Sequence, residues 1–166
     1  MTNWFHRQAT AYKNGNDRPL GGYLVLMGIY GGGTALAAVG ARAFGRKPPA
    51  GIGPWDLAQL TVATQKLARL IAKDPITSPI RAPFTTYEGT SAPAELKEEV
   101  RGHGLQHSIG ELLTCPMCLG QWVATAFMLG LVVAPKATRV ATATLTAVSG
   151  ADFLQYLYAQ TQQATE

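Results

Sequence analysis

Two long stretches of the chain carry no charged residue. The first runs from Leu20 to Ala41 and the second from Leu112 to Pro135. A helix rises ~1.5 Å per residue, so ~20 predominantly apolar residues are needed to cross the ~30 Å hydrocarbon core of a bilayer. Both stretches meet that length, and each therefore predicts a membrane-spanning helix.

The segment from Ile52 to Ile71 is apolar with partial helical periodicity, but charges interrupt it. Asp56 lies near its start, and Lys66 and Arg69 lie in its last turns. Two interpretations remain open. The segment spans the membrane with its cations extended toward the headgroups, or it lies as an amphipathic helix in the interface.

A fourth apolar segment, from Val140 to Tyr158, is interrupted only by Asp152. Its aromatic residues, which include Phe153 and Tyr156, gather near one end. The headgroup region of a bilayer favours aromatic rings. We therefore expect a span here as well.

These segments predict an all-α fold, an integral membrane bundle of four transmembrane helices. Charged residues make up only 14 % of the chain, against the ~25 % expected of soluble domains. The first uncharged run continues beyond the small residues at which a signal peptide would be cut, so we expect an uncleaved anchor. The predicted organisation is a polar leader (1–19), one membrane domain (20–158) with spans of about 20–41, 52–72, 116–135 and 138–158 and a loop at 73–115, and a polar tail (159–166).

The distribution of lysine and arginine predicts that both termini and the 73–115 loop face the cytoplasm. Cytoplasmic segments of membrane proteins carry an excess of these residues. In this orientation nine of them lie inside and five outside. The inner set is Arg7, Lys13, Arg18, Lys66, Arg69, Lys73, Arg81, Lys97 and Arg101, and the outer set is Arg42, Arg46, Lys47, Lys136 and Arg139. We expect a multi-pass protein of the cytoplasmic membrane, whereas three spans would place the termini on opposite sides.

Small residues recur at helical spacing in the first and last spans. Gly28 and Gly32 have the GxxxG spacing, and Ala143, Ala147 and Ala151 follow one another four apart. Such residues let helices approach closely in lipid, where no hydrophobic drive pulls one helix onto another. We call these two rows of small residues the small-residue seams. We expect them to pack against other helices of the same chain, with contacts between copies of the chain in a homo-oligomer as the alternative.

The loop between the second and third spans differs in composition from the rest of the chain. Its prolines exclude a regular helix from Pro75 to Pro83. The run from Ala94 to Arg101 follows a proline and begins with acidic residues, which predicts a short helix. This loop is the segment in which we expect a protein partner to dock.

Both cysteines of the chain lie at the mouth of the third span. Cys115 and Cys118 are separated by two residues, a spacing that lets two thiols chelate a metal or close a disulfide. With His103 and His107 they complete a Cys2His2 ligand set suited to zinc, although the order and spacing differ from those of a zinc finger. Zinc is the one cofactor that these residues suggest.

A redox interpretation starts from Pro116, which suits the first position of a helix and leaves Cys115 as the N-cap. A helix N-terminus stabilises a thiolate at that position. Two observations argue against this interpretation. A membrane thiol oxidase that passes electrons to a quinone ordinarily needs a second cysteine pair, which the chain lacks. A pair that faces the cytoplasm would also be kept reduced. Besides a zinc site and a redox pair, a third alternative is that the two thiols only pack against neighbouring side chains at the start of the helix.

Two motifs resemble those of the DUF1360 family, small bacterial membrane proteins of unknown function. The first is Lys-Leu-Ala-Arg-Leu-Ile-Ala-Lys-Asp-Pro-Ile at 66–76, followed by Arg81, and the second is Gly-Glu-Leu-Leu-Thr-Cys-Pro-Met-Cys-Leu-Gly-Gln-Trp at 110–122. The resemblance covers Trp55 to about Tyr158. It implies that the second segment is a true span and gives a loose cue toward a role in the bacterial envelope, but it implies no activity. The matching motif residues are Arg69, Asp74, Arg81, Glu111, Cys115, Cys118, Gly120 and Trp122.

Asp152 is a further candidate, because an acid at the centre of a bilayer costs at least ~2.5 kcal/mol and is functional by default. Counted from Val140 it lies ~18 Å along the last span, past the midplane. We expect it to form a structural pair with Arg69 or to reach the inner headgroups. A proton-coupled transporter would need more buried polar groups.

The chain contains neither a complete catalytic set nor a phosphate-binding glycine loop nor a nucleic-acid motif. Attraction to anionic lipid accounts for its net charge of +4, so we expect the bilayer and no nucleic acid as a partner. We therefore expect a structural or partner-binding protein, a scaffold or assembly factor. A thiol–disulfide or zinc-dependent membrane enzyme is the first alternative, and a small transporter is the second.

Overall fold

The computed structural model describes residues 2–13, 18–47 and 51–163, and it is predominantly helical. Parts of the predicted leader and tail lie outside the described residues. The elements in chain order are α1 (Thr2–Lys13), α2 (Leu20–Ala43), α3 (Pro54–Lys73), the 3₁₀ turn η1 (Pro75–Thr77), α4 (Ser78–Arg81), β1 (Thr85–Ala92), β2 (Glu95–Val100), α5 (Gly104–Thr114), α6 (Pro116–Val133) and α7 (Pro135–Gln163).

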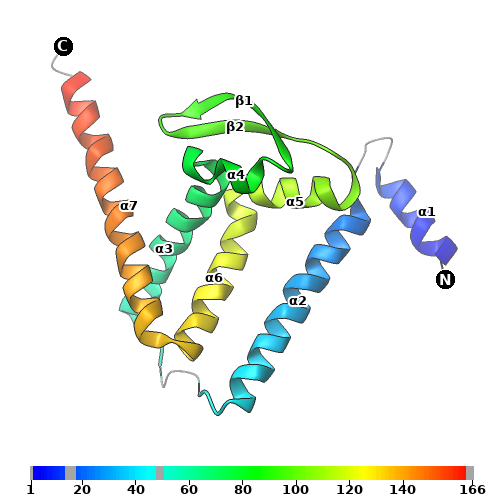
Figure 1. Cartoon of the computed structure of the whole chain (residues 1–166), viewed down its shortest axis with the longest axis horizontal. Helices are drawn as coiled ribbons and strands as arrows, with labels where there is room; N and C mark the ends of the chain where they lie inside the picture. Colours follow the sequence, from blue (N-terminus) through cyan, green and yellow to red (C-terminus); the bar gives the residue numbers. More distant parts are fainter. Residues whose placement is uncertain (1, 14–17, 48–50, 164–166) are drawn as a thin grey trace.

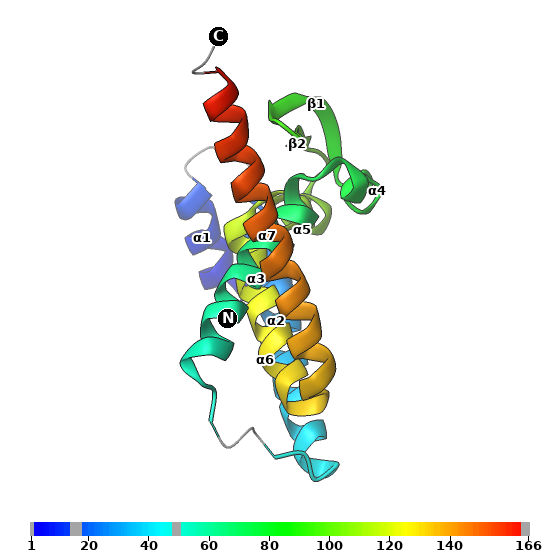
Figure 2. The same cartoon turned by 90° about the vertical axis from the view of Figure 1, so that its left-hand side faces the viewer.

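Four long helices, α2, α3, α6 and α7, alternate in direction (Figure 1). α2 leads away from the β-hairpin, α3 returns to it, α6 leads away again and α7 returns. The elements between α3 and α6, residues 75–114 and here called the head, gather at one end, and the turned view places the hairpin to one side of α7 (Figure 2). The start of α2 and the end of α7 therefore lie at the head end.

Among the described helices, α2 and α6 are long and apolar enough to cross a membrane by length and composition alone. Helix α3 matches the predicted segment at 52–72, but it carries charged residues at both ends, and its spanning stays a prediction. Helix α7 is longer than the predicted 138–158. Its polar end contains no proline or glycine, so nothing in the local sequence stops the helix before Gln163.

The core lies where α3 and α6 pack together, with α7 on a further side of α3. Ala68 and Ala72 of α3 are buried against Leu119 and Val123 of α6. Alanines at this contact let the two helix backbones approach closely. The cysteine pair begins α6, so this contact holds it in place.

The predicted small-residue seams do not pack the bundle. A side chain added at Gly28 or Gly32 would meet nothing within 4 Å, because α2 contacts the rest of the molecule chiefly through α5. On α7 the alanines at 143, 147 and 151 are exposed, and Thr138 and Thr142 are the buried residues. The prediction of internal packing at these seams is wrong, because another face of each helix makes the contacts.

The head contains an antiparallel hairpin in place of the helix predicted over 94–101. β1 and β2 pair from Thr85 opposite Val100 to Ala92 opposite Glu95. Ala94 has a φ of 58° in the connecting turn, which a helix excludes. The helix prediction is wrong because it used local signals alone, whereas strand formation depends on cross-strand neighbours.

The segment predicted to lack a regular helix, Pro75 to Pro83, contains η1 and the single turn of α4. Each begins where a proline suits the first helical positions, Pro75 in η1 and Pro79 in α4. The prediction that no regular helix runs from Pro75 to Pro83 is therefore confirmed, because the segment holds only these two short turns.

Candidate functional site

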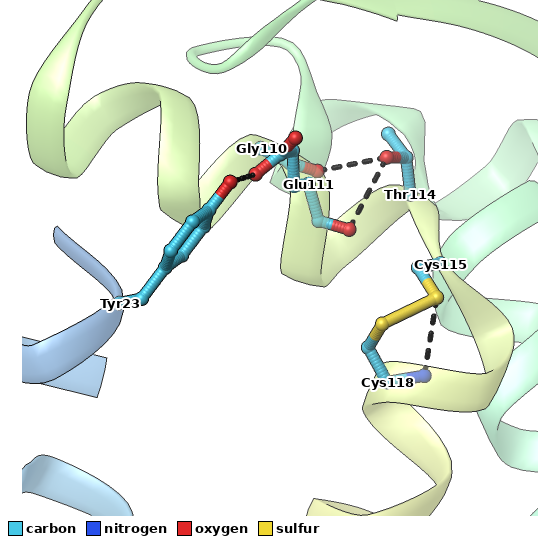
Figure 3. Close-up of a disulfide and its surroundings, with 6 residues drawn as sticks. All are labelled: Tyr23, Gly110, Glu111, Thr114, Cys115 and Cys118. Carbon is cyan, nitrogen blue, oxygen red and sulfur yellow. Dashed lines mark hydrogen bonds between the residues drawn. A yellow bond between two sulfur atoms is a disulfide. The ribbon is translucent and has the colours of Figure 1, made fainter. Parts of the chain in front are cut away.

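The cysteine pair lies at the junction of α5 and α6. Cys115 has an extended backbone between the two helices, and Pro116 is the first residue of α6. The backbone N–H of Cys118 donates to the Cys115 sulfur at 3.2 Å, so the prediction that Cys115 is the N-cap is confirmed. A disulfide joins the two residues, whose Cα atoms are 5.3 Å apart (Figure 3).

This geometry makes the two sulfurs chemically different. The free N–H groups and the positive end of the helix dipole at the start of α6 stabilise a thiolate on Cys115. Cys118 is the more exposed of the two residues. An attacking thiolate therefore reaches Cys118 more readily, and Cys115 is the better leaving group.

A cavity of about 570 Å³ lies between α2 and the junction of α5 with α6, and both cysteines border it. Leu26, Met27 and Leu112 form apolar walls. A second cavity of about 390 Å³ adjoins the first and shares these three residues and Cys118. Small-molecule sites commonly measure ~300–1,000 Å³, so the volume suits a ligand.

One side of the larger cavity is polar. The Tyr23 hydroxyl on α2 donates a hydrogen bond to the Glu111 carboxylate on α5, and Arg18 pairs with the same carboxylate at 3.0 Å. Figure 3 draws the Tyr23 ring reaching Glu111 across the space that the disulfide also borders. The hydrogen bond with Tyr23 and the charge of Glu111 raise the pKa of Arg18 above its usual value. Arg18 therefore supplies a permanent positive charge beside Glu111.

The second cavity contains an aromatic pair. The Tyr30 ring meets Trp122 edge-on with centroids 5.1 Å apart. The Tyr30 hydroxyl lies 2.7 Å from the Thr125 hydroxyl and accepts a hydrogen bond from Gln121 at 3.1 Å. The motif residue Trp122 thus joins α6 to α2. A side chain added at Gly120 would meet nothing within 4 Å, so no packing contact among the described residues requires a glycine there.

The structure does not assemble the predicted zinc ligands. Within the described ranges, no three His, Cys, Asp or Glu side chains are grouped so as to hold a metal ion. His107 faces Glu111, with its Nε2 3.5 Å from Oε1. His103 is the N-cap of α5, and this helix of 11 residues, ~16 Å long, separates it from Cys115. The continuity of α5 is the physical reason that the four residues do not converge.

Arg81 links the head to the end of α3 through an ion pair and hydrogen bonds. Its side chain is fully buried and pairs with Glu98 of β2. It also donates to the carbonyls of Ile71 at 2.6 Å and Asp74 at 3.1 Å. The Asp74 carboxylate accepts the N–H of Ile76 and so begins η1. These two motif residues act on the fold of the head.

Asp152 forms a structural pair, as predicted, but its partner is Lys66 of α3, so the expectation of Arg69 is wrong. Arg69 pairs with Glu95 of the head. The two cations lie three residues apart on α3, and the structure directs one to α7 and the other to β2. The pair accounts for Asp152 without a proton pathway.

Sequence reasoning missed the contribution of α2 to this site. Tyr23 and Tyr30 lie 88 and 95 residues before their partners Glu111 and Thr125. No local pattern connects segments so far apart. The one available signal is the spacing of the two tyrosines, seven residues or two helical turns, in an otherwise apolar run.

Comparisons with known proteins agree with the predicted resemblance. The family described as "Protein of unknown function (DUF1360)" matches residues 59–158. A curated relative, "Sporulation protein YjcA" of Bacillus subtilis (strain 168), is 35 % identical over 83 residues, which are 48 % of this chain and 70 % of the relative. No solved structure matches the chain. The matched region holds Glu111 and both cysteines and excludes α2.

Proposed function

The chain belongs to the DUF1360 family, and on that premise we propose that it is a multi-pass membrane protein whose Cys115–Cys118 pair cycles between disulfide and dithiol. Its reaction class is thiol–disulfide exchange with a dithiol substrate. The observation that carries the proposal is the disulfide at the N-terminus of α6, with the Cys118 N–H donating to the Cys115 sulfur beside an open cavity.

The proposed topology has α2, α3, α6 and α7 as spans and the head in the cytoplasm of a bacterial cell. The alternating directions of the four helices support it, as does the excess of lysine and arginine at the head end. Lys66 and Asp152 pair with each other, which lowers the cost of placing either in a bilayer. Disulfides in the cytoplasm are usually transient and either catalytic or redox-sensing, so a pair placed there is a redox-active one.

The exchange balances among four sulfurs. A substrate thiolate attacks the Cys118 sulfur, the Cys115–Cys118 bond breaks, and Cys115 leaves as a thiolate stabilised by the start of α6. The second substrate thiolate then attacks the substrate sulfur of the mixed disulfide and releases Cys118. The substrate leaves as a disulfide after losing two electrons and two protons, and the cysteine pair gains the same two electrons and two protons and becomes a dithiol.

A redox titration tests the proposal. The protein, purified in mild detergent, is equilibrated in glutathione buffers of graded potential and alkylated, and its free thiols are counted by mass spectrometry. We expect both thiols to appear together as one reversible two-electron transition. Thiols that remain free, or remain bonded, across the whole range of buffers would overturn the proposal.

A second candidate function is a scaffold whose head docks a protein partner during development. The observation that favours it is the attachment of the hairpin to α3 through the Arg81–Glu98 and Arg69–Glu95 pairs, which holds an exposed element in one position. The relative's name assigns that relative to sporulation. Replacing both cysteines by serine separates the candidates, because full complementation of a deletion strain would support the scaffold and contradict the redox proposal.

A further inference from the structure

We propose that the cavity between α2 and the junction of α5 with α6 binds a membrane quinone, and that this quinone takes two electrons from the reduced Cys115–Cys118 pair. The inference rests on the proposed function, because it names the electron acceptor of the same two cysteines. It assigns a ligand class to a cavity that the exchange reaction leaves unused.

The first step of the argument is the need for an acceptor. After it has oxidised a substrate, the pair is a dithiol and must lose two electrons and two protons. A quinone-linked thiol oxidase ordinarily relays electrons through a second cysteine pair, but this chain has two cysteines in all, so substrate and acceptor would have to react in turn with the same pair. The acceptor must therefore meet the pair directly. A quinone balances the reaction, because two S–H bonds break, one S–S bond forms, and the two carbonyl oxygens become the O–H groups of a hydroquinone.

The second step is the position of the cavity relative to the sulfurs. Both cysteines border the larger cavity, and Cys118 borders the smaller one as well. Cys118 is thus the sulfur that a bound ring can approach from either cavity. Met27 lines both cavities and is 68 % exposed, so the cavities open on the outer surface of α2. In the proposed topology this surface contacts lipid. A ligand dissolved in the bilayer can enter there without crossing water.

The third step is the match between polar groups and a quinone ring. A quinone carbonyl accepts hydrogen bonds, and the Arg18 guanidinium brings N–H donors to the polar side of the cavity, while the O–H of Tyr23 is donated to Glu111. The Glu111 carboxylate beside them is an acceptor for the protons that leave the thiols. Once Glu111 has taken a proton from a thiol, its hydrogen bond with Tyr23 reverses: the protonated carboxyl donates to the Tyr23 oxygen, and the Tyr23 O–H turns to the carbonyl oxygen. Desolvated sites commonly combine apolar walls with a few placed polar groups in this way.

The smaller cavity accounts for the rest of the ligand. It continues beside Leu26 and Met27 toward Tyr30 and Trp122, deeper along α2 and α6. An apolar isoprenoid tail leaving the ring would follow this route along two apolar helices into the bilayer. The geometry therefore points to a lipid-soluble quinone with its ring near Cys118 and its tail between α2 and α6.

The test uses the full-length protein, reduced, freed of reductant and kept without oxygen. Decylubiquinone is added, hydroquinone formation is followed by ultraviolet absorbance, and the disulfide is counted by alkylation. We expect one hydroquinone per disulfide. Leu26→Trp, which fills both cavities, should slow this step by about tenfold, equivalent to ~1.4 kcal/mol. Leu36→Trp, on the same helix but 75 % exposed, is the matched control and should react like the wild type.

Oxidised glutathione serves as a second oxidant that reaches the sulfurs from water. The quinone proposal is overturned if glutathione closes the disulfide in the wild type and decylubiquinone does not, while the proposed exchange function then stands. It is also overturned if Leu26→Trp slows both oxidants equally, because the substitution would have disturbed the cysteines themselves. If neither oxidant closes the disulfide, both proposals fail.

Discussion

The Tyr23 hydroxyl donates a hydrogen bond to the Glu111 carboxylate, and this bond joins the first turn of α2 to the middle of α5 across 88 residues of sequence. Close to it, Gly22 lies so near Ser108 that a side chain at Gly22 would collide with the serine hydroxyl. These two contacts hold α2 against the head, where it forms one wall of the cavity beside the disulfide.

Tyr23→Phe should loosen α2 from the head. The substitution removes a hydrogen bond to a charged group but leaves the Arg18–Glu111 pair, so we expect a loss of about 1 kcal/mol in the free energy of unfolding. Thermal unfolding in detergent measures it. Tyr87→Phe, at a tyrosine that is 62 % exposed on the hairpin, is the control. An equal effect from both variants would contradict the assigned role of Tyr23.

Two glycine substitutions should have opposite outcomes. A Cβ at Gly110 would lie 2.5 Å from the Val100 side chain and 3.0 Å from the Phe84 carbonyl, so Gly110→Ala should push the hairpin away from α5 at a cost of ~1–3 kcal/mol. Gly28→Ala adds a methyl group in open space and should be tolerated. Limited proteolysis of the head and thermal unfolding report both effects, and tolerance of Gly110→Ala would contradict the packing described.

Arg81→Met should destabilise the head strongly. The change leaves Glu98 buried without its cation, and breaking one side of a buried pair costs ~3–5 kcal/mol. Lys97→Met, on the exposed face of β2, is the matched control. Adding Glu98→Leu to Arg81→Met should recover much of the loss, measured as resistance to protease. A double variant as unstable as the single one would argue against the pair as the cause.

Labelling single cysteines tests the proposed topology. In the background without Cys115 and Cys118, Ile76→Cys places a thiol on the head and Phe44→Cys places one at the opposite end of α2, at positions 80 % and 84 % exposed. A membrane-impermeant maleimide added to intact cells should label Phe44→Cys alone, and Ile76→Cys only after permeabilisation. Labelling of both positions from outside would mean that α3 does not span, and labelling of Ile76→Cys alone would mean that the orientation is inverted.

The order of exchange predicts different behaviour for the two single cysteine variants. Cys115→Ser leaves the exposed Cys118 without its partner, so a mixed disulfide formed there cannot be resolved internally. It should accumulate glutathione adducts on incubation with oxidised glutathione. In Cys118→Ser an adduct on Cys115 should be removed faster by reduced glutathione, because the start of α6 makes Cys115 the better leaving group. Mass spectrometry measures both adducts, and slower release from Cys115 than from Cys118 would reverse the assigned roles of the sulfurs.

The helices were predictable where the signal is local. The uncharged run that begins at Leu20 specifies α2, and Pro116 after Cys115 specifies where α6 begins, so the N-cap is readable from these two residues. The hairpin was not predictable in this way. Its second strand contains helix-favouring residues such as Glu95 and Lys97, and only pairing with β1 overrides that preference.

Ion-pair partners show the same limit. The sequence analysis expected Arg69 as the cation beside Asp152, and the structure pairs Asp152 with Lys66, three residues earlier, because that side of α3 faces α7. The Asp56–Arg139 pair, with both hydrogen bonds at 3.0 Å, likewise joins α3 to α7 from positions 83 residues apart. The local sequence around these residues does not predict either partner.

The sequence by itself determined the family, the four long helices, their apolar runs and the position of Cys115 at a helix start, because each depends on residues within a few turns of one another. Only the tertiary structure decided that Tyr23 meets Glu111, that α5 keeps His103 away from the cysteines, and that the disulfide borders a cavity. These features arise from how α2 and α5 pack against α6. Packing partners are chosen by shape and charge across the whole fold, and distance along the chain does not constrain them.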